Sequence, residues 1–195
     1  GDIDGDGFDD FQLYISNELT RGNRTYYGSP NASLERKEDV LYLKTDFFPD
    51  PEFRSSRVLK DWNNDGLEDF AILYANRIDI HCGGDEMTVP KFTIPVDKNH
   101  FATEMAIGDF TGDGFEDIAL TVRYFTDAGS QKEVYFYFGS ENPDDQIDHV
   151  IKSPLSESSY SFTMSVSNIG DFNGDGIDDI ATVSTGWPEA FVFLG

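Results

Sequence analysis

One nine-residue acidic pattern occurs four times in this chain of 195 residues, and it constrains the fold more than any other feature. The copies read DIDGDGFDD (residues 2–10), DWNNDGLED (61–69), DFTGDGFED (109–117) and DFNGDGIDD (171–179). Positions 1, 3, 5 and 9 carry oxygen-bearing side chains, position 6 is always glycine, and position 7 is always a large apolar residue. Because four copies share all these positions, they predict a repeated structural unit.

The spacing of the oxygen-bearing side chains suits a hard cation. Calcium takes about 6–8 oxygen ligands from carboxylates, amides, carbonyls and water. The glycine at position 6 permits a sharp turn, because glycine adopts a positive φ at little cost. At position 7 we expect the backbone carbonyl to bind the metal while the side chain points into a core. The residues at position 7 are Phe8, Leu67, Phe115 and Ile177.

Two other interpretations of the loops are open. An EF-hand loop needs a glutamate at position 12 and a helix after the loop. Here position 12 is Leu13, Ile72, Leu120 or Thr182, and a short β-rich apolar run follows each loop, so an EF-hand is disfavoured. The remaining alternative is a metal-free one, in which the acidic turns only keep β-hairpins in contact with solvent.

The distances between the loops predict an all-β fold. The loops start 59, 48 and 62 residues apart, which is the length of a four-stranded sheet with variable turns, as in a blade of a β-propeller. We therefore expect one partial propeller over residues 1–195, with approximate repeats at 1–52, 53–100, 101–159 and 160–195. Two connections read as extended turns: residues 17–24, and the segment between expected strands at 118–124 and 133–140.

A second recurring element identifies a resemblance. After each loop come a strand and then another strand that ends in Phe-Gly or a variant, at Tyr27-Gly28, Cys82-Gly83, Phe138-Gly139 and Leu194-Gly195. This arrangement resembles the FG-GAP repeats of the integrin α-chain β-propeller and their bacterial VCBS-type relatives. The resemblance implies four-stranded antiparallel blades, with a calcium loop between the first and second strands.

Carried over by position, the resemblance also implies up to four Ca²⁺ ions and their side-chain ligands. These are Asp2, Asp4, Asp6 and Asp10; Asp61, Asn63, Asp65 and Asp69; Asp109, Thr111, Asp113 and Asp117; and Asp171, Asn173, Asp175 and Asp179. The chain holds about three and a half repeats, so we expect an arc of a larger propeller whose remaining blades belong to a longer chain.

The charge of the chain narrows the classes of partner. The formal net charge is −23, and the four loops hold 17 of the 37 acidic residues but no lysine or arginine. Nucleic-acid binding is disfavoured, because it requires clustered basic side chains. No apolar run is long enough to span a membrane. The sequons at Asn23 and Asn31 add to the expectation of an extracellular or cell-surface glycoprotein.

No catalytic residue pattern stands out, so we expect a module that is not an enzyme. The favoured function is binding of a protein or glycan ligand, as in cell adhesion, with structural calcium and with carbohydrate binding as a subtype. The alternative is a non-catalytic propeller domain of a secreted or surface hydrolase or lyase. The ligand is expected at the rim opposite the loops, where exposed aromatic and arginine side chains are typical contacts. The candidates there are Arg21, Arg24, Tyr124, Phe125 and Trp187.

Overall fold

The computed structural model describes residues 2–16, 20–29, 39–43, 53–63, 65–84, 89–97, 99–127, 129–152, 165–183 and 190–195. These residues form fourteen strands and no helix. Within these ranges there is accordingly no helix with the length and apolar character needed to cross a membrane.

The strands form four antiparallel sheets that follow one another along the chain. The first sheet contains β1 (Phe11–Ser16), β2 (Thr20–Tyr26) and β3 (Asp39–Leu43). The second contains β4 (Phe53–Leu59), β5 (Asp69–Tyr74), β6 (Arg77–His81) and β7 (Phe92–Pro95). The third contains β8 (His100–Gly108), β9 (Asp117–Thr126), β10 (Gly129–Tyr137) and β11 (His149–Lys152). The fourth contains β12 (Val166–Gly170), β13 (Asp179–Val183) and β14 (Ala190–Phe193).

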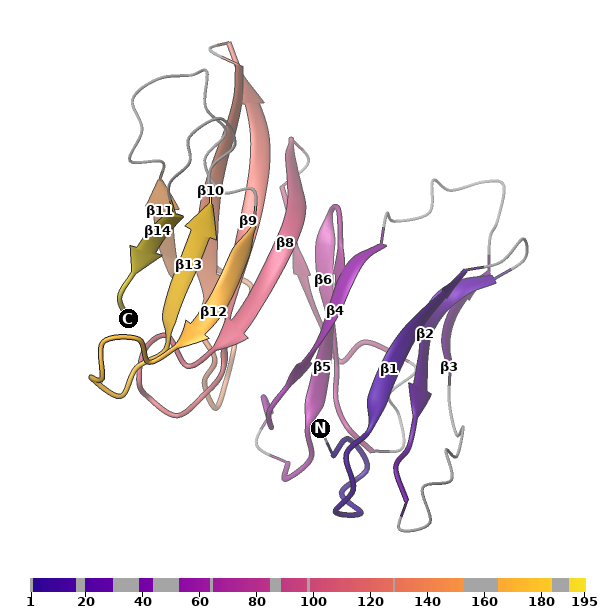
Figure 1. Cartoon of the computed structure of the whole chain (residues 1–195). Coiled ribbons are helices and arrows are strands. Elements are labelled where there is room, and N and C mark those ends of the chain that lie inside the picture. The colour runs from indigo at the N-terminus through magenta and orange to yellow at the C-terminus, as the bar shows by residue number, and fades with distance from the viewer. Residues whose placement is uncertain are drawn as a thin grey trace.

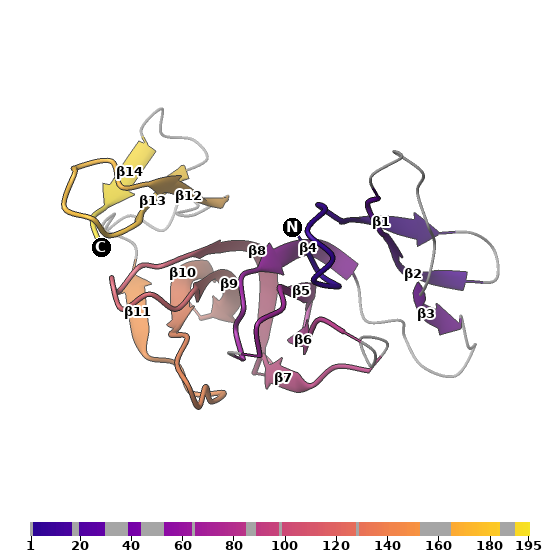
Figure 2. The same cartoon turned by 90° about the horizontal axis from the view of Figure 1, so that it is seen from below.

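Successive sheets stand face to face, and the first strands of the second, third and fourth sheets are neighbours. β8 contacts both β4 and β12, the first strands of the sheets on either side. Figure 1 shows the sheets side by side in chain order, and Figure 2 shows the same order from below. The four acidic loops all lie at one rim, the lower one in Figure 1. The fold is therefore the predicted partial β-propeller of antiparallel blades.

The cores of this fold lie between the sheets. One cluster joins the first and second sheets, and it includes Ile3, Tyr27 and Phe70. The largest cluster joins the second and third sheets, and the next joins the third and fourth. Alternate residues of the central strands face opposite neighbours, as side chains do along a strand. In β5, all six residues are buried for this reason.

The structure corrects two expected turns. Residues 20–24 of the turn expected over 17–24 belong instead to β2, the central strand of the first sheet, and residues 17–19 lie outside the described residues. The extended turn expected after residue 124 is a tight hairpin, in which Thr126 pairs with Gly129. Both segments are polar and look like turns in the sequence. They form strands because antiparallel backbone pairing accepts polar side chains wherever a sheet face meets solvent.

Candidate metal-binding loops

Each acidic loop joins the first strand of a sheet to the second, or, in the first sheet, precedes β1. The glycine at position 6 has a positive φ in every copy, between 89° and 93°, as the sequence predicts. The glycines at position 4 also have positive φ, between 73° and 82° in the three loops that have one. The backbone of each loop is thereby curled around the side chain at position 1.

The aspartate at position 1 accepts hydrogen bonds from the backbone of its own loop. Its Oδ2 accepts the N–H of the glycine at position 6 in all four loops, at 2.7–2.9 Å. The aspartate at position 5 accepts the N–H of position 7 at 2.9 Å in all four loops. These bonds fix two carboxylates on the inner side of the loop, where they can serve as metal ligands.

The aspartate at position 9 is buried and uses both oxygens. Its Oδ2 accepts the N–H of position 2 in every copy. Its Oδ1 accepts the N–H of the glycine that lies just after β2, β6, β10 or β14 in the same sheet. The second bond measures 2.8–2.9 Å in all four copies, formed by Gly28, Gly83, Gly139 and Gly195. Position 9 therefore ties the loop to the Phe-Gly element, a connection that reasoning from the sequence missed.

The same glycine is needed because the loop passes very close to it. A Cβ atom at Gly139 would lie 2.3 Å from the carbonyl oxygen of Glu116, and one at Gly28 would lie 2.6 Å from that of Asp9. Gly83 and Gly195 make the equivalent approach at 2.6 and 2.7 Å. No other residue fits without displacing the loop, which explains why each copy has a glycine at this position.

Burial changes the proton affinity of the position 9 carboxylates in the first three loops. It raises the pKa of Asp117 to about 7 and that of Asp69 to about 6, against the hydrogen bonds that lower them. The pKa of Asp10 is also raised, first of all by burial. Neighbouring loop carboxylates raise the pKa of all three further. These buried carboxylates would be stabilised in the charged form by a cation.

Oxygen atoms without partners mark the inside of two loops. The buried Oδ1 of Asp2 and the buried Oγ1 of Thr111 have no hydrogen-bonding partner in the part of the chain that the structure describes. In the first loop, one oxygen each from Asp2, Asp4 and Asp10 lies within 4.8 Å of the others. A buried acceptor without a partner is costly. The donor set is all oxygen, which fits calcium better than a metal that prefers sulfur or nitrogen ligands.

The prediction that position 7 points into a core is wrong for the first loop and incomplete for the others. Phe8 is 39% exposed. Leu67 and Ile177 are half-buried, and each packs against a glycine at position 4 of the preceding loop rather than into the cluster between the sheets. The reason is that the loops lie beyond the ends of the strands, where the side chain at position 7 meets the preceding loop.

The residues expected to bind a ligand are only partly described. Trp187 lies outside the described residues, and Arg21 and Arg24 lie on β2, where the structure describes the backbone alone. Tyr124 and Phe125 are neighbours on β9 at the end remote from the loops. They differ in surroundings, because the Tyr124 hydroxyl donates to Glu133 at 2.8 Å whereas Phe125 is 57% exposed.

An exposed aromatic surface surrounds Phe125. The guanidinium of Arg123 lies 4.6 Å from the centre of its ring, and the ring of Phe101 lies 6.4 Å away. Phe101 is itself 43% exposed. Phe101 and Arg123 were not singled out in the sequence, although cross-strand pairing of β8 with β9 brings them together.

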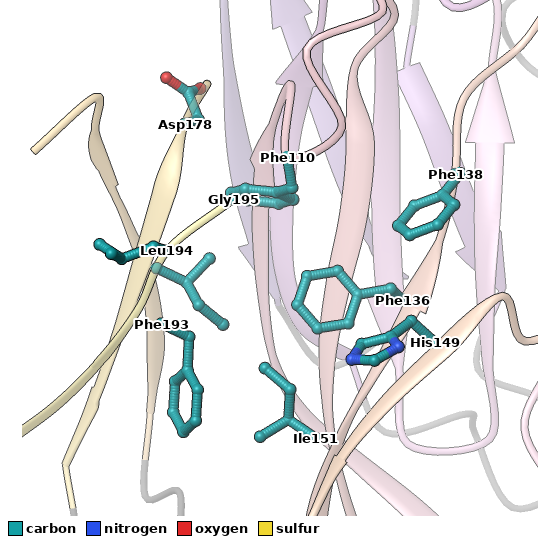
Figure 3. A pocket seen from close by; sticks show the side chains of 10 residues that line it. Phe110, Phe136, Phe138, His149, Ile151, Asp178, Phe193, Leu194 and Gly195 are labelled. Atoms are coloured by element: carbon teal, nitrogen blue, oxygen red, sulfur yellow. The ribbon is translucent and has the colours of Figure 1, made fainter. Parts of the chain in front are cut away.

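The apolar pocket in Figure 3 lies between the third and fourth sheets and has a different character. The volume of the pocket is about 120 Å³. The centre of the Phe136 ring lies 5.8 Å from the centre of the Phe110 ring and 5.8 Å from that of the His149 ring. A pocket for a small molecule is typically about 300–1,000 Å³. This pocket is therefore a gap in the packing between blades rather than a ligand site.

The recurrence of loop, strand and glycine agrees with the comparison against protein families. Residues 101–137, which contain the third loop and most of β8, β9 and β10, match the family model of the FG-GAP repeat. A search of curated proteins found no match to this chain. The matched segment includes Asp117 of the loop, and Gly139, whose N–H donates to Asp117, lies just beyond the matched residues. The chain thus contains one segment that matches the FG-GAP repeat, consistent with the resemblance of all four loops to this repeat.

Proposed function

We propose that this chain is a calcium-binding β-propeller module of an extracellular or cell-surface protein, and that it binds a protein or glycan ligand. The observation that carries the metal assignment is the buried Oδ1 of Asp2, which lacks a partner in the described residues and belongs to a group of three carboxylates within 4.8 Å. The repetition of one hydrogen-bonding pattern in all four loops extends the assignment to the other three.

Each loop offers five oxygen donors in this proposal. They are the side chains at positions 1, 3, 5 and 9 and the carbonyl at position 7. The hydrogen bonds to positions 1 and 5 orient those carboxylates before any ligand arrives, which lowers the cost of binding. Bound calcium would offset the mutual repulsion of the carboxylates and satisfy the acceptors that lack partners. The role of the metal is structural, because each loop joins strands of one blade.

Equilibrium dialysis against Ca²⁺ and Mg²⁺ tests the metal assignment. We expect up to four Ca²⁺ ions per chain at millimolar concentration, and weaker binding of Mg²⁺, which demands near-ideal octahedral geometry. Asp4→Asn should weaken binding at the first loop. Asp127→Asn is the matched control, since it removes the same charge from the exposed turn between β9 and β10. An equal loss of calcium affinity in both variants would mean that binding depends on the net charge of the chain and not on the ligands of the loops.

The ligand surface proposed here is the rim opposite the loops. Its support is the exposed group of Phe101, Arg123 and Phe125, because aromatic and arginine side chains are enriched where proteins make their strongest contacts. Tyr124 lies beside this group on β9, but its hydroxyl is not free to contact a ligand. Its hydroxyl is engaged by Glu133, and burial together with this bond raises the pKa of Tyr124 to about 12.

A panel of glycans and extracellular proteins, probed with and without calcium, tests the ligand proposal. Phe125→Ala should weaken the interaction found, while Ile147→Ala, which removes an apolar side chain that is 46% exposed elsewhere, should leave it intact. If Phe125→Ala and Tyr124→Ala preserve every interaction, this rim does not bind the ligand. We propose no catalytic role for the chain, and its loop carboxylates are assigned to metal binding.

A further inference from the structure

Adjacent loops are connected through position 8, which is acidic in all four copies. The backbone N–H of Asp178, at position 8 of the fourth loop, donates to the carbonyl oxygen of Asp109 at 3.0 Å. One carboxylate oxygen of Asp178 accepts the N–H of Asp109 at 3.3 Å. Asp109 is position 1 of the third loop. Both backbone groups of a proposed calcium ligand are therefore held by a residue of the neighbouring loop.

The connection recurs along the rim. The N–H of Glu68 in the second loop lies 3.4 Å from the carbonyl oxygen of Asp2 in the first. Between the second and third loops, the carboxylate of Glu116 accepts the backbone N–H of Lys60, the residue before position 1. The Lys60 ammonium is 3.7 Å from Glu116, but the side chain of Lys60 is 77% exposed, so this ion pair contributes little. The backbone hydrogen bonds carry the connection.

A second contact joins the same loops through apolar packing. A Cβ atom at Gly112, position 4 of the third loop, would lie 2.9 Å from Cγ1 of Ile177 in the fourth loop. A Cβ atom at Gly5 in the first loop would lie 2.7 Å from Cδ2 of Leu67 in the second. The glycine at position 4 therefore provides the space into which position 7 of the next loop fits.

We propose that positions 7 and 8 of one loop are positioning residues for the calcium site of the preceding loop, so that neighbouring sites bind calcium cooperatively. The inference rests on the calcium function proposed above. Position 8 lies between two donors of its own site, the carbonyl at position 7 and the carboxylate at position 9. Calcium that orders these two donors also orders position 8 between them. Position 8 in turn orders the backbone of position 1 in the preceding loop.

The coupling is expected only between neighbouring loops. It joins the first loop to the second and the third to the fourth through both kinds of contact. The first and fourth loops lie at opposite ends of the arc in Figure 1, so calcium at one should not affect the other. Coupling between binding sites is reciprocal, and it typically changes affinity by about 5–150-fold.

The test is a calcium titration followed by NMR, with the amides of the glycines at position 6 as one reporter for each loop. Each of these amides donates to the position 1 carboxylate of its own loop. Asp175→Ala removes a proposed ligand of the fourth site. We expect the affinity of the third loop to fall by about fivefold or more, while that of the first loop stays the same.

A second variant separates positioning from loss of the metal. Asp178→Ala leaves the proposed ligands of the fourth loop in place but removes the carboxylate that holds the N–H of Asp109. It should weaken calcium binding at the third loop. Asp9→Ala is the matched control, because Asp9 is position 8 of the first loop, which is separated from the third loop by the second. It should leave the third loop unaffected.

The outcomes separate this inference from the function on which it rests. If no glycine amide responds to calcium, the calcium assignment itself fails. If every loop responds but the third binds equally well in wild type, Asp175→Ala and Asp178→Ala, the sites are independent and the inference is overturned. Should Asp178→Ala fail to fold, as judged by its amide spectrum, the comparison of wild type with Asp175→Ala decides the question.

Discussion

The substitution Gly139→Ala tests the contact between the third strand and the loop in the matched FG-GAP repeat. The new methyl group would lie 2.3 Å from the carbonyl oxygen of Glu116 and 3.0 Å from Cβ of Phe115. The backbone of Gly139 is outside the left-handed region, so the effect arises from lack of space alone. Relieving the clash must move the loop away and lengthen the 2.8 Å bond from Gly139 to Asp117.

The expected cost combines two terms. Overpacking typically destabilises a protein by about 1–3 kcal/mol, and loss of a hydrogen bond to a charged group costs about 1.5–3 kcal/mol. Their sum, about 2.5–6 kcal/mol, corresponds to a fall in Tm of about 5–24 °C for a domain of this size. Thermal unfolding followed by circular dichroism, with a chelator present to remove the contribution of calcium, measures it.

Gly174→Ala is the control for this substitution. Gly174 has a φ of 82°, and no other atom lies within 4 Å of the position that a new methyl group would take, so alanine there meets only backbone strain. That strain costs about 1–2 kcal/mol. A fall in Tm for Gly139→Ala that is no larger than the fall for Gly174→Ala would refute the close-approach argument, since both variants would then report only the replacement of a glycine.

Three further predictions concern the loops. Without calcium, Tm should fall as the pH rises from about 4 to 7. The pKa values of Asp69 and Asp117 are raised to about 6 and about 7, so the folded state binds more protons than the unfolded state in this pH range. A Tm that rises with pH across this window in chelator would contradict the prediction. Asp117→Asn should flatten this pH dependence, as measured in the same scans. Thr111→Asp should raise the calcium affinity of the third loop several-fold relative to wild type in a site-resolved titration, because it adds a fourth carboxylate; unchanged affinity would show that charge does not limit this site.

The sequence predicts the loops and most strands well, for a physical reason. The acidic loops and their glycine turns are local, so residues within nine positions determine their backbone conformation. The strands expected at 118–124 and 133–140 correspond to β9 (Asp117–Thr126) and β10 (Gly129–Tyr137). The positive φ of Gly66 and its equivalents also follows from the local pattern. Where all the determinants of a structure lie close together in the chain, the pattern is sufficient.

The contacts between distant segments could not be predicted in the same way. Asp117 bonds to Gly139, 22 residues later, and Asp178 bonds to Asp109, 69 residues earlier. Such contacts depend on the stagger of strands and the spacing of blades, which no local pattern encodes. One signal for them was present, since position 8 is acidic in every copy, but a metal ligand set explains only positions 1, 3, 5, 7 and 9.

The most direct test of the calcium assignment is thermal unfolding of the chain in 1 mM Ca²⁺ and in excess chelator. Extracellular calcium modules often bind with a Kd of about 10⁻⁴–10⁻³ M. With Kd values in this range, 1 mM Ca²⁺ adds about 0.4–1.4 kcal/mol per site to the free energy of unfolding. Four sites therefore add several kcal/mol, and Tm should rise by several degrees, with a smaller rise in 1 mM Mg²⁺. An identical Tm in calcium and in chelator would contradict the assignment of these loops as calcium sites.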